Sequence, residues 1–406
     1  MGLELRIIVI GLLFFIISGA SVAITVGVYN VKDYGAAGDG QTDNTKAFVA
    51  AWSVACAVQG KATIVIPEGA YLLGPTIFKG PCNGIMVMQV IGQLLASTHL
   101  EAYNQYWLHF QYINGLVISG GGRFNGQGAS AWPYNQCKKT QDCKPLPMNL
   151  VFSFVMNAAI KSISSIDNMF FHIHIFGSRN ITFDSIKISA PGDSPNTDGI
   201  HIANSANIQV SNSVIGTGDD CISIGPGCTN LTIFRVLCGP GHGISIGSLG
   251  KNAGEKDVIG LYVSKCNLTG TTNGLRIKTL QSSPSTLKAS HFRFEQIIMN
   301  NVYNPIIIDQ NYCPSANCPK RYTSLLLLQN PSLVKITDIK YRNIMGTFLS
   351  PVAYNLVCSE AAPCEGVELS DINLKYNGNG KQANNASICV HVYGSSNGNV
   401  KPDPCI

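Results

Sequence analysis

The sequence predicts an all-β fold in which the chain coils as a parallel β-helix. Short runs rich in β-branched residues recur from about residue 110 onward, as at 180–183, 207–210 and 230–233, which begin 27 and 23 residues apart. Within each run apolar and polar residues alternate, which is the period of a β-strand. Asn, Gly and Ser separate the runs, and the units resemble one another, which a β-sandwich would not explain.

The composition indicates one large packed domain. Of the 406 residues, 45% are hydrophobic and only 13% are charged, so the chain can bury a sizeable core and is not of the disordered class. A count of 41 glycines and 19 prolines excludes a long coiled coil. The net charge of +5 is scattered, which suits an acidic partner but is too weak to indicate nucleic acid. We expect one domain over residues 24–406, acting as a monomer.

The first 23 residues have the pattern of a secretory signal peptide. Arg6 precedes an apolar run from Ile7 to Ile17, and small residues follow up to Ala23, where we expect cleavage. The alternative is a membrane anchor, but the run is short for a span and no stop-transfer charges follow it. The mature protein is therefore expected to be secreted to the extracellular space or cell wall, with no membrane attachment.

The cysteines and sequons agree with that compartment. All 14 cysteines lie beyond Ala23, and an even number after a signal peptide indicates up to seven disulfides. Short spacings suggest three local bridges, and no CxxC pair suggests zinc. The bridges are Cys137/Cys143, Cys313/Cys318 and Cys358/Cys364. Four Asn-x-Ser/Thr sequons are candidate glycosylation sites, at Asn180, Asn230, Asn267 and Asn385.

The two ends of the repeat differ from its body. The segment from Asp43 to Gln59 has helical character, and either Asp43 or Asn44 could cap it. We expect this short helix to close the N-terminal end of the solenoid, because terminal coils need a cap. The segment 376–406 is rich in Asn and Gly, holds Cys389 and Cys405, and is expected to close the other end.

Polar residues recur at the length of one coil. From Asp198 to Asp219 is 21 residues, from Asp219 to His242 is 23, and from His242 to Arg276 is 34, which is one coil plus a loop. In a β-helix such residues become neighbours about 4.8 Å apart on one face. Alone, each cluster is typical of a turn, a calcium site or a wet strand face. Together they predict one pocket that holds several carboxylates, an imidazole and two cations.

Such a pocket suits glycoside hydrolysis of an acidic sugar. Crowded carboxylates separate in pKa, so one can serve as general acid while another serves as base for water. Arg276 and Lys278 would bind an anionic group such as a sugar carboxylate. Asp219 and Asp220 are adjacent, and a regular strand would point them to opposite faces, so we expect the backbone to bend near Gly216 and Gly218.

These residues resemble the motifs of the polygalacturonases, a family of pectin-degrading glycoside hydrolases. The motifs are 196–198 (Asn-Thr-Asp), 218–220 (Gly-Asp-Asp), 241–243 (Gly-His-Gly) and 276–278 (Arg-Ile-Lys), in family order. The likeness extends over nearly the whole mature chain, and within the family the sequence is most similar to pollen exopolygalacturonases. Leu280 departs from the pattern, because plant members often carry Trp there, and this affects the expected subsite preference.

The resemblance implies a right-handed parallel β-helix, an inverting mechanism on pectin or polygalacturonate, and no cofactor or metal. Asp219 then matches the general acid, Asp198 and Asp220 the carboxylates that activate water, and His242 a residue that tunes the acid. The remaining positions carried over by the resemblance are Asn196, Arg276, Lys278 and Tyr312 for substrate binding, and Cys221 with Cys238 for a disulfide beside the site.

Other functions remain open at this stage. A pectate-type lyase would use calcium on the same solenoid, and a non-catalytic wall protein would keep the fold without the chemistry. A related hydrolase could act on rhamnogalacturonan or xylogalacturonan, and the sequence does not decide between exo and endo action. Retention of Asp198, Asp219 and Asp220 favours an enzyme over a wall-binding protein.

Overall fold

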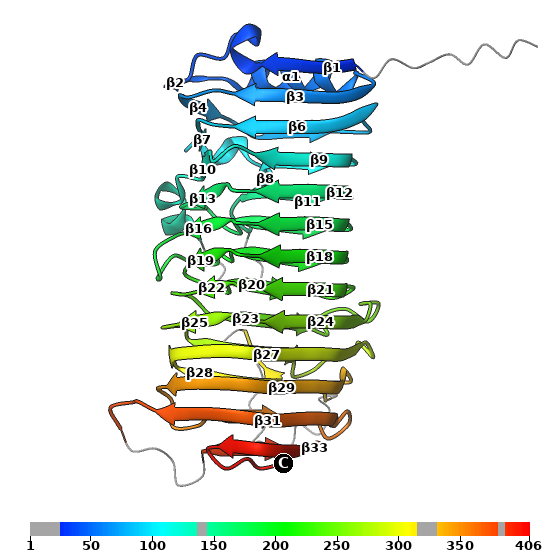
Figure 1. Cartoon of the computed structure of the whole chain (residues 1–406), viewed down its shortest axis with the longest axis vertical. Helices are drawn as coiled ribbons and strands as arrows, with labels where there is room; N and C mark the ends of the chain where they lie inside the picture. The colour runs from blue at the N-terminus through cyan, green and yellow to red at the C-terminus, as the bar shows by residue number, and fades with distance from the viewer. Residues whose placement is uncertain (1–24, 136–143, 315–330, 381–385) are drawn as a thin grey trace, which may run out of the picture.

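The computed structural model describes residues 25–135, 144–314, 331–380 and 386–406. In these ranges the chain forms a parallel β-helix whose coils stack one on another along the long axis (Figure 1). A coil carries up to three strands, and strands in the same position of successive coils pair in parallel, so that three rows run along the molecule. Two rows belong to a 22-stranded sheet, and the third forms a separate 11-stranded sheet. The predicted all-β solenoid is confirmed.

The first row forms one side of the solenoid and carries the longest strands. It consists of β1 (Thr25–Asn30), β3 (Gly60–Ile66), β6 (Gly84–Val90), β9 (Asn114–Ser119), β12 (Met156–Lys161), β15 (Arg179–Asp184), β18 (Ala206–Ser211), β21 (Thr229–Phe234), β24 (Val258–Ser264), β27 (Lys288–Val302), β29 (Lys335–Phe348), β31 (Cys364–Tyr376) and β33 (Val392–Lys401). Register follows the sequence repeat: Ile181 pairs with Ile208, Ile208 with Leu231, and Leu231 with Leu261.

The second row has short strands that continue the same sheet around a corner. It consists of β2 (Asp39–Asp43), β4 (Ala70–Leu73), β7 (Gln93–Ala96), β10 (Arg123–Asn125), β13 (Ser164–Ile166), β16 (Lys187–Ser189), β19 (Val214–Gly216), β22 (Leu237–Cys238) and β25 (Asn267–Thr269). After β25 this row merges with the first, because both β24 and β25 pair with the long strand β27.

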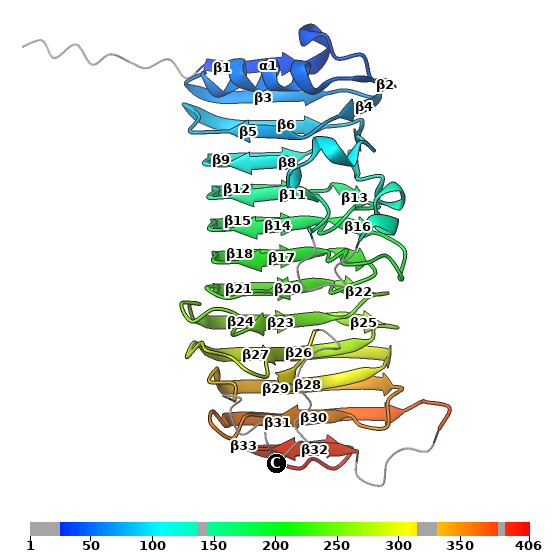
Figure 2. The same ribbon diagram turned by 180° about the vertical axis from the view of Figure 1, so that it is seen from behind.

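The third row is a separate sheet, seen in front in Figure 2. It consists of β5 (Thr76–Lys79), β8 (Tyr106–Gln111), β11 (Met148–Ser153), β14 (Ile173–Phe176), β17 (Ile200–Ala203), β20 (Ile222–Ile224), β23 (Ile244–Leu249), β26 (Asn273–Leu280), β28 (Asn304–Tyr312), β30 (Tyr354–Val357) and β32 (Ser387–Val390). Four short 3-10 helices, η1 (Val31–Tyr34), η2 (Leu100–Ala102), η3 (Gly128–Ser130) and η4 (Trp132–Tyr134), lie in the connections.

A single helix covers the N-terminal end of the coils. α1 (Thr45–Cys56) lies within the predicted segment and is seen at the N-terminal end of the coils in Figure 2. Its buried residues include Phe48 and Trp52. Of the two proposed caps, Asp43 accepts the Thr45 backbone N–H at 2.8 Å, whereas the Asn44 side chain bonds Ala37 and Thr42 instead. At the other end β32 and β33 form the last coil, and Cys389 is bonded to Cys405.

The cysteine prediction is partly confirmed and partly wrong. Cys221–Cys238 and Cys358–Cys364 form as expected, and Cys56–Cys82 adds a bridge from the last residue of α1 to the connection between β5 and β6. Cys137, Cys143 and Cys318 lie outside the described residues, while Cys313 is disulfide-bonded.

The 14 cysteines do not form seven disulfides, because Cys228 and Cys266 are buried free thiols. Each stands at a corner position where an earlier coil has a serine. Cys228 comes just before β21, as Ser205 comes just before β18. Cys266 comes just before β25, as Ser213 comes just before β19. Because the two thiols lie at different corners of the coil, they cannot pair.

The expected targeting and glycosylation sites are only partly visible. Residues 1–23 and Asn385 lie outside the described part of the chain. In the described part, Asn180 and Asn230 are exposed and Asn267 is half-buried. None of the helices there is long and apolar enough to span a bilayer.

Candidate active site

The predicted site residues come together where second-row strands turn into third-row strands. Asp198 lies between β16 and β17, Asp219 and Asp220 between β19 and β20, and His242 between β22 and β23. Arg276 and Lys278 follow on β26. Coil stacking therefore places residues up to 80 positions apart in the sequence in one cluster, as the spacing predicted.

The expected bend at the adjacent carboxylates is present. β19 ends at Gly216 and β20 begins at Ile222, so Asp219 and Asp220 occupy a non-strand segment. Gly218 allows this turn to pack closely, because a Cβ there would lie 2.0 Å from the backbone oxygen of Ser194. The bend frees both carboxylates to reach the same site, which a continuous strand would prevent.

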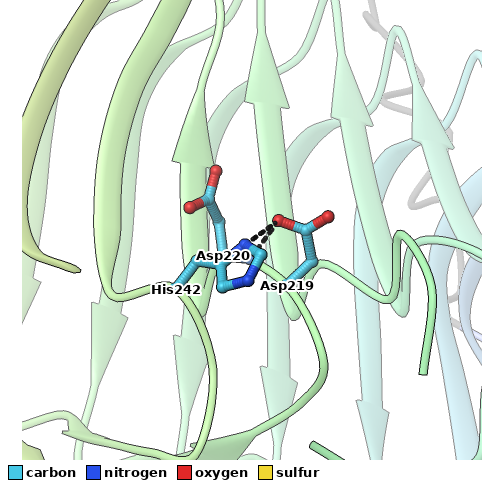
Figure 3. Close-up of side chains that lie close together, drawn as sticks. All are labelled: Asp219, Asp220 and His242. Atoms are coloured by element: carbon cyan, nitrogen blue, oxygen red, sulfur yellow. Dashed lines mark hydrogen bonds and ion pairs between the residues drawn. The ribbon is translucent and has the colours of Figure 1, made fainter. Parts of the chain in front are cut away.

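Asp219 is held by the imidazole of the next coil. Its Oδ1 accepts the Asp220 backbone N–H at 2.8 Å and lies 2.8 Å from His242 Nδ1 (Figure 3). Its Oδ2 has only a long contact, 3.5 Å, from Asn196 Nδ2, and the side chain is 19% exposed. Burial raises the pKa of Asp219, but the His242 hydrogen bond together with the charges of His242 and Lys278 outweighs it, so the net pKa is lowered.

Asp220 is the best-paired carboxylate of the cluster. Lys278 Nζ donates to Oδ2 at 3.0 Å, and Arg276 donates to Oδ1 at 3.2 Å. Ser245 Oγ also donates to Oδ1, at 2.8 Å. The side chain of Asp220 is only 2% exposed, so its charge is compensated in a place that water barely reaches.

Asp198 is buried, and no cation of the described residues contacts it directly. Its residue is 6% exposed, and its Oδ2 accepts a hydrogen bond from Ser223 Oγ at 2.6 Å. Burial is the largest influence, and with the charges of Asp219 and Asp220 it raises the pKa of Asp198 well above its usual range. The carboxylate cluster therefore holds its first proton on Asp198 more readily than on Asp219.

The other predicted binding residues border this cluster. Asn196 connects Asp219 to Asn135, whose amide donates to Asn196 Oδ1 at 3.1 Å. Tyr312 ends β28 opposite Leu280, and the ammonium of Lys278 lies 5.4 Å from its ring centroid. Tyr312 thus forms a side wall next to the cations.

The sequence interpretation missed three polar residues that support the carboxylates. Ser223, Ser245 and His201 alternate with buried isoleucines on β20, β23 and β17, so that their side chains point outward from the third sheet. The signal was available, because 200–202, 222–224 and 244–246 all have one polar residue between two isoleucines at a spacing of 22. Aligning these triplets would have placed the three polar residues in one row.

A metal fits this cluster poorly. Asp219, Asp220 and His242 each offer a ligand atom, and these atoms lie within 4.8 Å of one another. Lys278 and Arg276 already neutralise Asp220, and His242 already bonds Asp219. A divalent cation would have to displace these contacts and would be repelled by the two basic side chains.

Comparisons with known proteins identify a family and several relatives of this chain. The family model described as "Glycosyl hydrolases family 28" matches residues 56–395. An exopolygalacturonase of Zea mays is 43% identical over 381 residues, covering 93% of this chain and 90% of the maize protein. An exopolygalacturonase of Platanus acerifolia is 43% identical over 377 residues, covering 92% of this chain and 97% of its own.

A solved structure shares the architecture at low sequence identity. The endo-xylogalacturonan hydrolase of Aspergillus tubingensis superposes with a TM-score of 0.77 and 23% identity, over 92% of this chain and 99% of its own. At that identity the likeness concerns the parallel β-helix alone.

Proposed function

Since the chain belongs to glycosyl hydrolases family 28, we propose that it is a secreted polygalacturonase. It hydrolyses α-1,4-galacturonosyl bonds of pectin or polygalacturonate in the cell wall, by an inverting mechanism with general acid and base catalysis. The single observation that carries this proposal is the stacking of Asp198, Asp219, Asp220 and His242 with Arg276 and Lys278 in one cluster. The substrate class comes from the names of the maize and plane-tree relatives.

We assign the general acid to Asp219 on accessibility. Its side chain is 19% exposed and its Oδ2 has only the long contact to Asn196, whereas Asp198 and Asp220 are buried. The lowered pKa of Asp219 opposes this role. Burial is nevertheless the largest single influence on Asp219 and raises its pKa, so a bound sugar that covers this side chain shifts the balance toward the protonated acid.

Water activation falls to Asp220 and Asp198. Three donors fix both oxygens of Asp220, and Ser223 fixes one oxygen of Asp198. A water bound between them would attack the anomeric carbon while Asp219 protonates the leaving glycosidic oxygen. The anomeric configuration of the first product, followed by NMR, tests inversion.

Arg276 and Lys278 provide the specificity for an acidic sugar. Both already contact Asp220, and each keeps further N–H groups that can bind a galacturonate carboxylate. We expect Lys278→Ala to weaken binding of the free-acid polymer more than that of its methyl ester. Equal weakening on both substrates, measured as KM, would show that Lys278 does not recognise the carboxylate.

The central test is Asp219→Asn. The amide keeps the shape of the side chain but cannot donate a proton, so release of reducing ends from polygalacturonate should fall by roughly 10²–10⁴-fold or more. The unfolding midpoint should stay close to that of the wild type. Near-normal turnover by this variant would contradict the assignment of the acid.

We further propose that the enzyme is exo-acting, because the maize and plane-tree relatives are named exopolygalacturonases. Chromatography of early products separates the two modes, because an exo enzyme releases monomer from the outset and an endo enzyme releases mixed oligomers. A calcium-dependent lyase is tested in the same assay. Activity that is lost with EDTA, or products with unsaturated ends, would favour the lyase.

A further inference from the structure

Four side chains that point away from the core form a row across the third sheet, next to the carboxylates. His201 on β17 pairs in register with Ser223 on β20, Ser223 with Ser245 on β23, and Ser245 with Arg276 on β26. The two serines are in the middle, with an imidazole at one end and a guanidinium at the other. Each serine donates to a different carboxylate, Ser223 to Asp198 and Ser245 to Asp220.

The two serines are supported by groups of different charge. Arg276 Nε donates to Ser245 Oγ at 3.2 Å and also reaches Asp220 with its terminal nitrogen. His201 Nδ1 lies 2.7 Å from Ser223 Oγ. Burial, as the largest influence, lowers the pKa of His201 to about 3, so this imidazole is neutral in the working range of the site. Asp220 thus has a cationic support and Asp198 a neutral one.

The hydrogen-bond arrangement fixes the tautomer of His201. A serine hydroxyl has one proton, and when Asp198 is ionised that proton is donated to its Oδ2. Ser223 Oγ must then accept from His201, which places the imidazole proton on Nδ1. The ring is held for this task by stacking on Phe171, at 4.9 Å between centroids, and on His174, at 5.2 Å.

We propose that His201 is a positioning residue of the reaction, which orients Ser223 so that its hydroxyl stabilises ionised Asp198. This inference rests on the proposed function, in which Asp198 helps to activate water. The charged or titratable groups that act on Asp198 and His201 are Asp219, Asp220, Lys278 and His174. His242 and Arg276 contact Asp219 and Asp220 respectively. Of the groups on the third sheet, Ser223 donates directly to Asp198 and His201 acts through it.

The test compares variants that break and restore the hydrogen bonds from His201 through Ser223 to Asp198. Ser223→Ala and His201→Phe should each lower kcat on polygalacturonate roughly tenfold or more, with KM nearly unchanged, because a donor to a buried carboxylate is lost. The same loss raises the pKa of Asp198, so the acidic limb of the kcat profile should move up by about one pH unit. His201→Asn, whose amide nitrogen replaces Nδ1, should recover most of both effects.

Matched controls separate positioning from packing. His109 and Ser153 form a similar pair on the same sheet, with Nε2 and Oγ 2.9 Å apart, and among the described residues no carboxylate bonds to this pair. Ser153→Ala should leave the acidic limb in place. An unshifted limb in Ser223→Ala, or no recovery in His201→Asn, would overturn the inference while inactivity of Asp219→Asn still supports the proposed function. A wild-type chain inactive on polygalacturonate would instead overturn the proposed function itself.

Discussion

Asp198 shows how a residue can be needed for chemistry and costly for stability. Its pKa is raised by burial and by two neighbouring carboxylates, so its ionised form destabilises the native state. The native state then binds more protons than the unfolded chain, and stability falls as pH rises from the usual value of 3.8 through the raised native value.

Asp198→Asn should therefore stabilise the protein at neutral pH and abolish turnover. The amide removes the buried charge, while its oxygen can still accept from Ser223. We expect the unfolding midpoint at pH 7 to rise by roughly 1–3 °C, with the gain vanishing below pH 3.8. A lower midpoint at pH 7 would mean that Asp198 contributes favourable contacts that outweigh its desolvation.

A second prediction concerns the effect of His242 on the proton affinity of Asp219. The imidazole lowers the pKa of Asp219 through a hydrogen bond of 2.8 Å and through its charge. Asp219 must be protonated to act as acid, and in the enzyme–substrate complex, where the bound sugar covers it, the basic limb of kcat reports its pKa. His242→Ala should move this limb to higher pH while lowering the maximum. A basic limb that stays in place would assign it to another group.

At the scale of the coil, the predictable features were those fixed by periodicity. The spacing of Asp198, Asp219 and His242 was enough to bring them together, because the coils that carry them add 21 and 23 residues, close to one repeat length. The support from Ser223 and His201 was not foreseen, because their polar character is ordinary for an outward strand position. The free thiols of Cys228 and Cys266 were also not foreseen, since parity alone does not tell which corner a cysteine occupies.

An asparagine ladder stabilises one corner of successive coils. Asn157 donates to Asn114 at 2.8 Å, Asn180 to Asn157 at 3.0 Å, and Asn207 to Asn180 at 2.9 Å. Asn157, Asn180 and Asn207 have φ of 54°, 57° and 56°, in the left-handed region that Asn tolerates better than most residues. The corner thus depends on both the amide and the backbone preference.

Substitutions at Asn157 can separate the amide hydrogen bonds from the backbone preference, since this residue lies within the ladder and outside any sequon. Asn157→Ala loses both amide bonds and places Cβ in a strained conformation, so we expect a loss of roughly 1–3 kcal/mol in the free energy of unfolding. Asn157→Gly loses the same bonds without the strain and should cost about 1 kcal/mol less. Equal losses in urea unfolding would show that the left-handed backbone adds nothing.

At the scale of the whole molecule, the core is a set of side-chain stacks that runs through the coils. Near the N-terminal end Trp52 of α1 packs on Phe78, and Phe78, Phe110 and Phe152 stack with centroids 4.9 and 5.3 Å apart. The helix therefore joins the solenoid through the same kind of stacking that joins coils to one another. In such a solenoid each coil contacts mainly its neighbours, so disturbances should stay local.

Two fully buried side chains test this locality. Phe110→Ala on β8 should cost roughly 3–5 kcal/mol of unfolding free energy but leave kcat of the folded protein unchanged, because the catalytic turns lie several coils away. Ile277→Ala should cost a comparable amount and also lower kcat, since Ile277 lies between Arg276 and Lys278 on β26 and its removal loosens both cations. Stability would be measured in denaturant and kcat well below the unfolding transition. If Phe110→Ala lowered kcat as much as Ile277→Ala, the core would transmit disturbances along the whole solenoid, and the site could not be treated as a property of its own coils.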